Sequence, residues 1–167
     1  MDQTCPSPLI RRFGAAEWPA YRSLRLRSLD DAPEAFCSTL AAEESYASET
    51  WSERLLRAET LDIDCPLVAE LDGKMAGLVW AKVDGDDASV VNLFQMWVAP
   101  EARGRRVGVA LLDQAVGWAR ARGARAVCLS VRCGNAAALS LYEKAGFREV
   151  ERVPAEHRMR LDLASQA

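Results

Sequence analysis

The sequence predicts an α/β protein of the α+β type, in which helices flank one mixed, mostly antiparallel twisted sheet. Two observations lead to this class. Apolar residues recur at helical spacing in some segments and run or alternate in others, and the two kinds of segment are interleaved along the chain. With 167 residues, of which 50% are apolar and 27% charged, the chain has the size and composition of one globular domain. We therefore expect a single domain over residues 1–167.

The first part of the chain predicts one strand followed by two helices. Residues 9–12 form a short apolar strand. Residues 16–28 carry apolar side chains at helical spacing, and Pro19 stands where the first turn of a helix tolerates proline. The acidic stretch that ends at Pro33 interrupts this helix, and a second helix is expected over residues 50–59.

The middle of the chain changes to the shorter period of strands. We expect strands over residues 66–71, 75–83 and 88–98. Asp72 and Gly73 form a dipeptide typical of a tight hairpin turn, and a second polar turn separates the next two strands. These three strands should form an antiparallel meander.

The last part of the chain alternates helices with strands. Helices over residues 105–122 and 135–144 each end near a glycine that suits a helix C-terminus, and strands are expected over residues 125–131, 147–153 and 157–163. The long helix should carry a right-handed crossover between two parallel strands. The complete order is β-α-α-β-β-β-α-β-α-β-β.

Composition argues against several classes of partner. The net charge is −3 and the isoelectric point is about 5.3, so nucleic acid is not an expected partner. No apolar run reaches membrane length and no signal-peptide pattern begins the chain, so we expect a cytoplasmic protein without membrane contact. The five cysteines are scattered, without C-x-x-C spacing, which predicts reduced thiols and no metal site.

The most informative segment joins strand 88–98 to the long helix. It reads Val98-Ala-Pro-Glu-Ala-Arg-Gly-Arg-Arg-Val-Gly-Val-Ala-Leu-Leu112. A helix N-terminus presents free N–H groups and the positive end of the helix dipole, and it therefore suits a phosphate. Cations are disfavoured at this end of a helix, so Arg103, Arg105 and Arg106 indicate a bound polyanion.

Two common phosphate-binding motifs do not fit this turn. A P-loop requires G-x-x-x-x-G-K followed by serine or threonine, and no such run is present. A dinucleotide-binding turn requires G-x-G-x-x-G, and Gly104 and Gly108 do not have that spacing.

Two blocks of sequence instead resemble the GNAT superfamily of N-acetyltransferases. The block Val98-x-Pro100-x-x-Arg103-Gly104-x-x-Val107-Gly108-x-x-Leu111-Leu112 looks like that family's acetyl-CoA-binding motif. The block Asn135-x-x-Ala138-x-x-Leu141-Tyr142-Glu143-Lys144-x-Gly146-Phe147 is similar to the one that closes the cofactor site. They follow each other in the family's order, and the predicted element order also agrees across nearly the whole chain.

The resemblance implies acetyl-CoA as cosubstrate and no metal. Its pyrophosphate would lie on the turn, and its pantetheine arm along the preceding strand. The implied cofactor-binding residues are Met96, Trp97, Val98, Arg103, Gly104, Arg105, Arg106, Val107, Gly108, Val109 and Asn135. Residues 88–150 would form the acetyl-CoA-binding core, and the helices within residues 14–60 would form the acceptor side.

The turn departs from the family pattern [Q/R]-x-x-G-x-[G/A] at one place. Arg103 and Gly108 match its two ends, but Arg106 stands at the first glycine. An arginine there suits phosphate binding if its backbone adopts helical dihedrals, because the N–H is the binding group. Gly108 costs the helix roughly 1 kcal/mol against alanine. Two explanations for a glycine at this position stay open. A side chain there would press on the pyrophosphate or on the neighbouring strand, or the helix packs tightly on the sheet without any ligand.

The resemblance also implies a reaction, namely acetyl transfer to a primary amine by direct attack in a ternary complex. Tyr142 falls on the family's general-acid position, where a phenol donates a proton to the departing thiolate. The alternative is a tyrosine that only packs its ring in the core. A splay or bulge near Met96 and Trp97 would expose the backbone that holds the acetyl group. Asn135 would contact the pantetheine, cap the following helix, or do both.

The base and the acceptor are not assigned by the sequence. Glu43 and Glu44 lie in the region expected near the acceptor, Gln95 cannot titrate, and the single histidine, His157, is more often structural on such a strand. Residues 30–64 contain ten acidic residues against two arginines, which would attract a cationic amine. A solvated helix face is the alternative.

The sequence thus predicts a GNAT-like N-acetyltransferase acting on a small molecule or a peptide. Two other functions stay open: a regulatory domain that binds CoA or acyl-CoA without turnover, and an acyltransferase with a longer acyl donor. The amine acceptor is the expected partner, and a homodimer is compatible with the fold.

Overall fold

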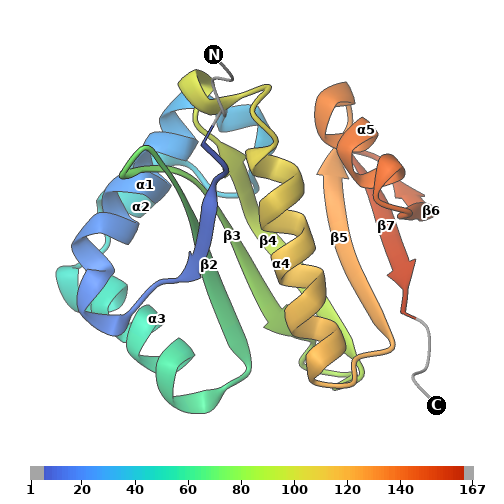
Figure 1. Ribbon diagram of the computed structural model, residues 1–167, viewed down its shortest axis with the longest axis horizontal. Coiled ribbons are helices and arrows are strands. Elements are labelled where there is room, and N and C mark those ends of the chain that lie inside the picture. Colours follow the sequence, from blue (N-terminus) through green and yellow to red (C-terminus); the bar gives the residue numbers. More distant parts are fainter. Residues whose placement is uncertain (1–5, 164–167) are drawn as a thin grey trace.

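In the computed structural model, which describes residues 6–163, the seven predicted strands form one sheet (Figure 1). The order across the sheet is β1-β2-β3-β4-β5-β7-β6. Strands β4 and β5 pair in parallel, as the crossover requires, and the other neighbouring strands pair antiparallel. The predicted fold class is therefore confirmed.

The strands are β1 (Leu9–Arg12), β2 (Asp64–Leu71), β3 (Lys74–Val83), β4 (Val90–Val98), β5 (Ala126–Arg132), β6 (Arg148–Val153) and β7 (Glu156–Asp162). The helices are α1 (Trp18–Asp31), α2 (Leu40–Glu44), α3 (Ser48–Leu61), α4 (Val107–Ala121) and α5 (Ala136–Lys144). The sequence did not predict α2, because five residues are too few to display a helical period. Within residues 6–163, no helix is both long enough and apolar enough to cross a membrane.

The predicted turns adopt the conformations that their residues favour. Asp72 and Gly73 have φ values of 54° and 76°, so the hairpin between β2 and β3 has positive φ at both central residues. Gly123 and Gly146 follow α4 and α5 with φ values of 77° and 98°. Glycine adopts this conformation without steric cost, and it ends each helix as expected.

Helices cover both faces of the sheet, which gives the protein two buried clusters. In Figure 1, α4 lies in front of the sheet, α1 to α3 gather on the left, and α5 lies on the right beside β5 and β7. Leu67 and Val79 belong to the cluster under α4, whereas their neighbours Val68 and Leu78 belong to the cluster under α1 and α3. Side chains thus alternate between the two clusters along β2 and β3, as the pleat of a strand requires.

The cysteines agree with the prediction of reduced thiols. Cys37, Cys65, Cys128 and Cys133 are free, and Cys5 lies outside the described residues. Burial raises the pKa of the Cys65 thiol to about 11, so this thiol stays protonated at neutral pH.

Candidate active site

The sheet opens between β4 and β5. The two strands pair over three residues, from Val90 to Asn92 of β4, and then diverge (Figure 1). Strand β4 continues to Val98 and β5 to Arg132 without further pairing between them. The second half of β4 therefore keeps an edge of backbone groups with no strand partner among residues 6–163, which is the splay that the family resemblance implied.

A β-bulge interrupts β4 at the start of this free edge. Strand β4 has two residues, Gln95 and Met96, where β3 has the single residue Val79. Gln95 has a φ of 60°, in the left-handed region that residues other than glycine seldom occupy. The bulge that the family resemblance implied near Met96 and Trp97 is present, and it begins one residue earlier, at Gln95.

The bulge also changes which face the following side chains meet. Val91 and Leu93 belong to the cluster under α4, and strict alternation would put Trp97 there as well. Trp97 lies instead in the cluster under α1 and α3, because the extra residue shifts the alternation by one position.

The start of α4 carries a row of backbone N–H groups without partners. The flanking hydrogen bonds run from Arg103 N to Pro100 O at 3.3 Å and from Ala110 N to Arg106 O at 3.1 Å. Between them, no hydrogen bond to the described chain is made by the N–H groups of Gly104, Arg105, Arg106, Val107, Gly108 and Val109. The first turn of α4 contains no acidic residue. This arrangement fits a pyrophosphate, whose oxygens accept several hydrogen bonds at the positive end of a helix.

Arg106 departs from the predicted conformation. Its φ and ψ are 65° and 19°, which is left-handed and not helical, and α4 begins at Val107 rather than near residue 105. The chain makes a sharp turn into the helix at this position. Glycine makes such a turn without steric cost, whereas arginine carries strain of about 1–2 kcal/mol. Strained residues of this kind concentrate at functional sites.

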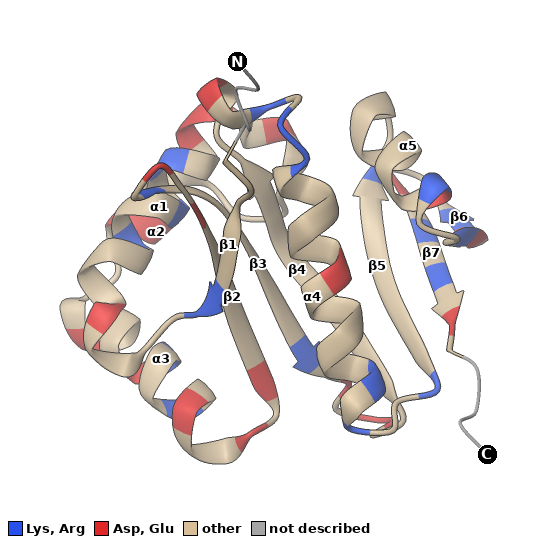
Figure 2. Cartoon of the chain, viewed as in Figure 1, with Lys and Arg blue, Asp and Glu red and all other residues tan. Residues whose placement is uncertain are grey.

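The arginines of the turn are partly neutralised by carboxylates. Arg103 donates to Asp31 at 2.5 Å and to the carbonyl of Val98 at 3.2 Å, and Arg105 lies 3.5 Å from Asp72. Arg106 alone of the three has no carboxylate within 4.0 Å among the described residues. Carboxylates of the protein therefore partly offset the charges of Arg103 and Arg105, and the interpretation of the three arginines as contacts of a bound polyanion stays a prediction. Figure 2 shows these basic positions in the loop that leads into α4.

Asp31 connects α1 to the free edge of β4. Its carboxylate accepts the indole N–H of Trp97 at 2.9 Å and also contacts Arg103. These hydrogen bonds, that of Trp97 first, hold the pKa of Asp31 below its usual value. Because the Trp97 indole is buried and hydrogen-bonded, the backbone of Trp97, and not its side chain, is available to a ligand.

Gly108 lies where α4 meets α5. A Cβ atom built on it would lie 3.4 Å from Cδ2 of Leu141 and 3.6 Å from Cγ2 of Val98, which are ordinary contact distances. The packing of α4 against its neighbours thus leaves room for alanine. Protein packing alone therefore does not require a glycine at this position.

Tyr142 follows Leu141 on α5 and is 5% exposed. Its ring packs edge-on against Phe147 with the centroids 5.7 Å apart. Among residues 6–163 the hydroxyl has no hydrogen-bond partner, yet it is not one of the fully buried unsatisfied groups. Burial raises the pKa of Tyr142 well above its usual value, so the phenol keeps its proton at neutral pH.

Asn135 caps α5 through its side chain. Its Oδ1 accepts the N–H of Ala138 at 3.2 Å, as the capping alternative predicted. The residue is partly exposed, so capping leaves its side-chain amide N–H groups available to a ligand.

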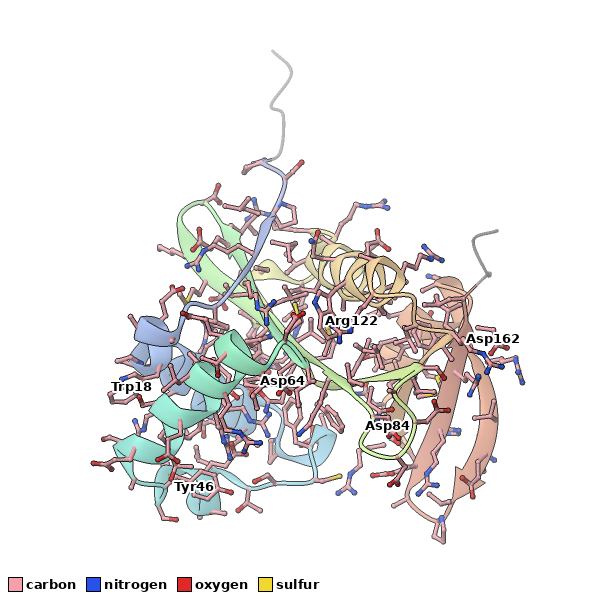
Figure 3. All side chains as sticks on the ribbon, turned by 90° about the horizontal axis from the view of Figure 1, so that it is seen from below. Trp18, Tyr46, Asp64, Asp84, Arg122 and Asp162 are labelled. Atoms are coloured by element: carbon pink, nitrogen blue, oxygen red, sulfur yellow. The ribbon has the colours of Figure 1, made fainter. Side chains whose placement is uncertain are left out.

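A pocket of about 300 Å³ opens at the bulge, on the side of the sheet that α1 and α3 cover. It is lined by Tyr21, Arg54, Arg57, Asp64, Trp80, Lys82, Phe94 and Gln95. The Tyr21 hydroxyl donates to Oε1 of Gln95 at 2.8 Å, which fixes the Gln95 side chain in the pocket. In Figure 3, Asp64, the first residue of β2, lies near the middle of the molecule beside α3.

The sequence singled out few of the pocket residues. They come from two helices and three strands, and no spacing along the chain connects Tyr21, Arg57 and Lys82. The sequence singled out Gln95 only as a side chain that cannot titrate. The positive φ that makes it the bulge residue has no sequence signal of its own, because glutamine rarely adopts it.

The candidate bases have different surroundings. Glu43 is 2% exposed and pairs with Arg25 through two hydrogen bonds, of 2.9 and 3.2 Å, so both of its oxygens are engaged. Glu44 is exposed on α2. His157 contacts Glu149 at 2.8 Å between β7 and β6, at the far edge of the sheet from β1. Among the described residues, no cluster of His, Cys, Asp and Glu has the arrangement of a metal site.

Comparison with known proteins identifies the family. The sequence profile of the Acetyltransferase (GNAT) family matches residues 25–147. The chain therefore belongs to the GNAT acetyltransferase family, as the resemblance predicted.

Similar proteins support this assignment. Mycothiol acetyltransferase of Beutenbergia cavernae is 35% identical over 143 residues, which are 84% of this chain and 45% of that protein. The probable N-acetyltransferase camello of Xenopus tropicalis is 36% identical over 107 residues, 59% of this chain and 49% of that protein. The chain thus spans about half the length of these curated relatives.

Solved structures agree with the fold. A GNAT-family acetyltransferase from Streptococcus pneumoniae superimposes with a TM-score of 0.79 at 26% identity, over 95% of this chain and 100% of that one. The PaiA N-acetyltransferase from Thermoplasma acidophilum, in complex with coenzyme A, gives a TM-score of 0.79 at 20% identity with the same coverage. The second likeness is one of fold alone.

Proposed function

We propose that the protein is an N-acetyltransferase that moves an acetyl group from acetyl-CoA to a primary amine. The observation that carries this proposal is the row of unpartnered N–H groups from Gly104 to Val109, beside the free edge of β4. Together they offer one site for a pyrophosphate and a neighbouring edge for an amide-containing chain. Membership of the GNAT family supports the class of reaction.

Two parts of the site bind two different parts of acetyl-CoA. The pyrophosphate accepts hydrogen bonds from the N–H groups at the start of α4. The guanidinium of Arg106 is available to pair with the negative charge of the pyrophosphate. The pantetheine arm pairs with the backbone of Met96 to Val98, and acetyl-CoA supplies the thioester. In this proposal residues 88–150 form the cofactor side and the helices within residues 14–60 cover the acceptor side of a single domain.

Tyr142 acts as the general acid. The amine nitrogen bonds to the thioester carbonyl carbon, the carbon–sulfur bond breaks, and the sulfur takes the phenolic proton. The proton that the amine loses returns to Tyr142 through solvent, so the reaction is balanced with acetyl-CoA and the amine as its only reactants. Burial raises the pKa of Tyr142, which keeps the phenol protonated at neutral pH and also makes it a weaker acid, so the role rests on hydrogen-bond donation to the departing sulfur together with proton transfer.

Acetyl-CoA binding and turnover test the proposal together. Calorimetry should detect acetyl-CoA binding, and a thiol-release assay with a broad panel of amines should detect free CoA. Binding without release for any amine would favour a regulatory CoA-binding domain. Release only with longer acyl donors would favour another acyltransferase, and neither binding nor release would refute the proposal.

A further inference from the structure

The pocket at the bulge is basic, although the surrounding sequence is acidic. Three cationic side chains line it, those of Arg54, Arg57 and Lys82, against the single carboxylate of Asp64. Asp64 is buried, and its Oδ1 accepts the indole N–H of Trp80 at 2.8 Å. The positive charges therefore outnumber the negative one, and that carboxylate already has a partner.

Two of these cations have no counterion. Arg57 and Lys82 are exposed, and neither has a carboxylate within 4.0 Å in the described part of the chain. Arg54 lies 3.6 Å from Glu43, but Glu43 is shared with the much closer Arg25. The pocket thus presents uncompensated positive charge to whatever enters it.

Three of the acidic residues that were expected to attract a cationic amine pair with arginines outside the pocket lining or behind it. Asp31 pairs with Arg103, and Asp62 lies 3.7 Å from Arg122 at the opposite end of α4. Glu43 is buried against Arg25. An excess of acids over residues 30–64 of the sequence therefore does not produce an acidic pocket in the folded protein.

The position of the pocket connects it to the proposed reaction. Gln95 lines the pocket and is the bulge residue, directly before Met96 on the free edge of β4. Because Tyr21 donates to Oε1 of Gln95, the amide Nε2 is left to donate to a ligand. A molecule in the pocket therefore lies against the strand proposed to hold the acetyl group.

We propose that the acceptor is a small amine that carries a carboxylate, of which an amino acid is the simplest example. Its carboxylate is held by Arg57 and Lys82 with Arg54 behind them, and its amine points toward Gln95. This inference rests on the proposed function. The volume of about 300 Å³ suits such a molecule, because it is at the lower end of the range for ligand pockets.

Matched acceptors test the inference. Amino acids and their carboxamides share the amine and the side chain and differ in the carboxylate. In the thiol-release assay, the carboxylate forms should have kcat/KM values at least about tenfold higher, as expected for loss of one charge-assisted contact. Carboxamides used equally well or better would overturn the inference and leave the proposed function intact.

Variants identify the cations responsible. Arg57→Gln and Lys82→Gln should each raise KM for the amino acids by about tenfold, with KM for the carboxamides and the Kd for acetyl-CoA unchanged. Arg120→Gln is the matched control, because Arg120 is exposed near the end of α4 and lines neither the pocket nor the first turn of α4. An equal rise of KM for both acceptor forms would contradict a contact with the carboxylate.

Binding of a product analogue gives a readout that does not need turnover. N-acetyl amino acids carry the carboxylate, and calorimetry should show them binding to the wild-type protein and losing affinity in Lys82→Gln. Absence of binding to the wild-type protein would refute the inference, whether or not acetyl-CoA binds. Binding that is unchanged in both Arg57→Gln and Lys82→Gln would refute it as well.

Discussion

Replacing Tyr142 with phenylalanine should lower turnover far more than it lowers stability or acetyl-CoA affinity. The substitution removes one oxygen atom that has no hydrogen-bond partner among the described residues, and it keeps the ring that packs against Phe147. No cavity forms and no buried donor loses its partner. The free energy of unfolding should therefore change by no more than about 0.5 kcal/mol.

The expected loss of activity follows from the proposed acid role. General acid catalysis contributes typically 10²–10⁴-fold, so kcat should fall by about 100-fold or more, which corresponds to at least about 2.7 kcal/mol of transition-state stabilisation. Burial raises the pKa of Tyr142, so the proton stays on the phenol as pH rises through the usual tyrosine range near 10. Loss of this proton should therefore not reduce wild-type kcat between about pH 8 and pH 10.

Three measurements decide this prediction: kcat at saturating substrates, the acetyl-CoA Kd from calorimetry, and unfolding in urea. Tyr46→Phe is the matched control, since Tyr46 packs against Trp51 on the other face of the sheet. An unchanged kcat in Tyr142→Phe would refute the acid role. Equal losses of kcat and acetyl-CoA affinity would make Tyr142 a packing residue.

Three further substitutions test other parts of the structure. Gly108→Glu should abolish acetyl-CoA binding, because it adds bulk and a negative charge next to the pyrophosphate. Gly108→Ala should fold normally, because the added Cβ meets only ordinary contacts. Unchanged acetyl-CoA affinity in Gly108→Glu would contradict the placement of the ligand. Glu43→Ala should lower the free energy of unfolding in urea by about 3–5 kcal/mol, because it leaves the buried Arg25 without its counterion; a loss below about 1 kcal/mol would show that this pair is not important for stability. Gly77→Ala should lower the free energy of unfolding in urea by about 1–3 kcal/mol, because the added Cβ would lie 2.7 Å from the carbonyl oxygen of Trp97. An unchanged free energy of unfolding would mean that β3 and β4 move apart at this position with little loss of stability.

Much of the fold could be predicted because its signals are local. Strand β1 has the predicted bounds, and the hairpin at Asp72 and Gly73 forms because those two residues tolerate positive φ. The helix ends at Gly123 and Gly146 follow from the same property. Each of these features depends on a few neighbouring residues, so the sequence contains it directly.

The candidate site was predictable in its backbone and not in its charges. The sequence located the strand-to-helix turn, and its resemblance to the GNAT family implied the splay and the role of Tyr142, of which the role stays a prediction. It did not reveal the carboxylate partners of Arg103 and Arg105, because Asp31 and Asp72 come from distant segments. It also failed for Arg106, whose side chain favours a helical conformation that the turn does not allow.

The sequence by itself determined the class of fold, the order of its elements and the family of the protein. Only the tertiary structure decided the chemistry of the acceptor pocket. One extra residue at Gln95 turns Trp97 to the opposite face, and pairing with Arg25 and Arg103 removes Glu43 and Asp31 from the charges available to a ligand. The physical reason is that the charge of a pocket depends on which side chains remain unpaired after folding, whereas composition counts every charge.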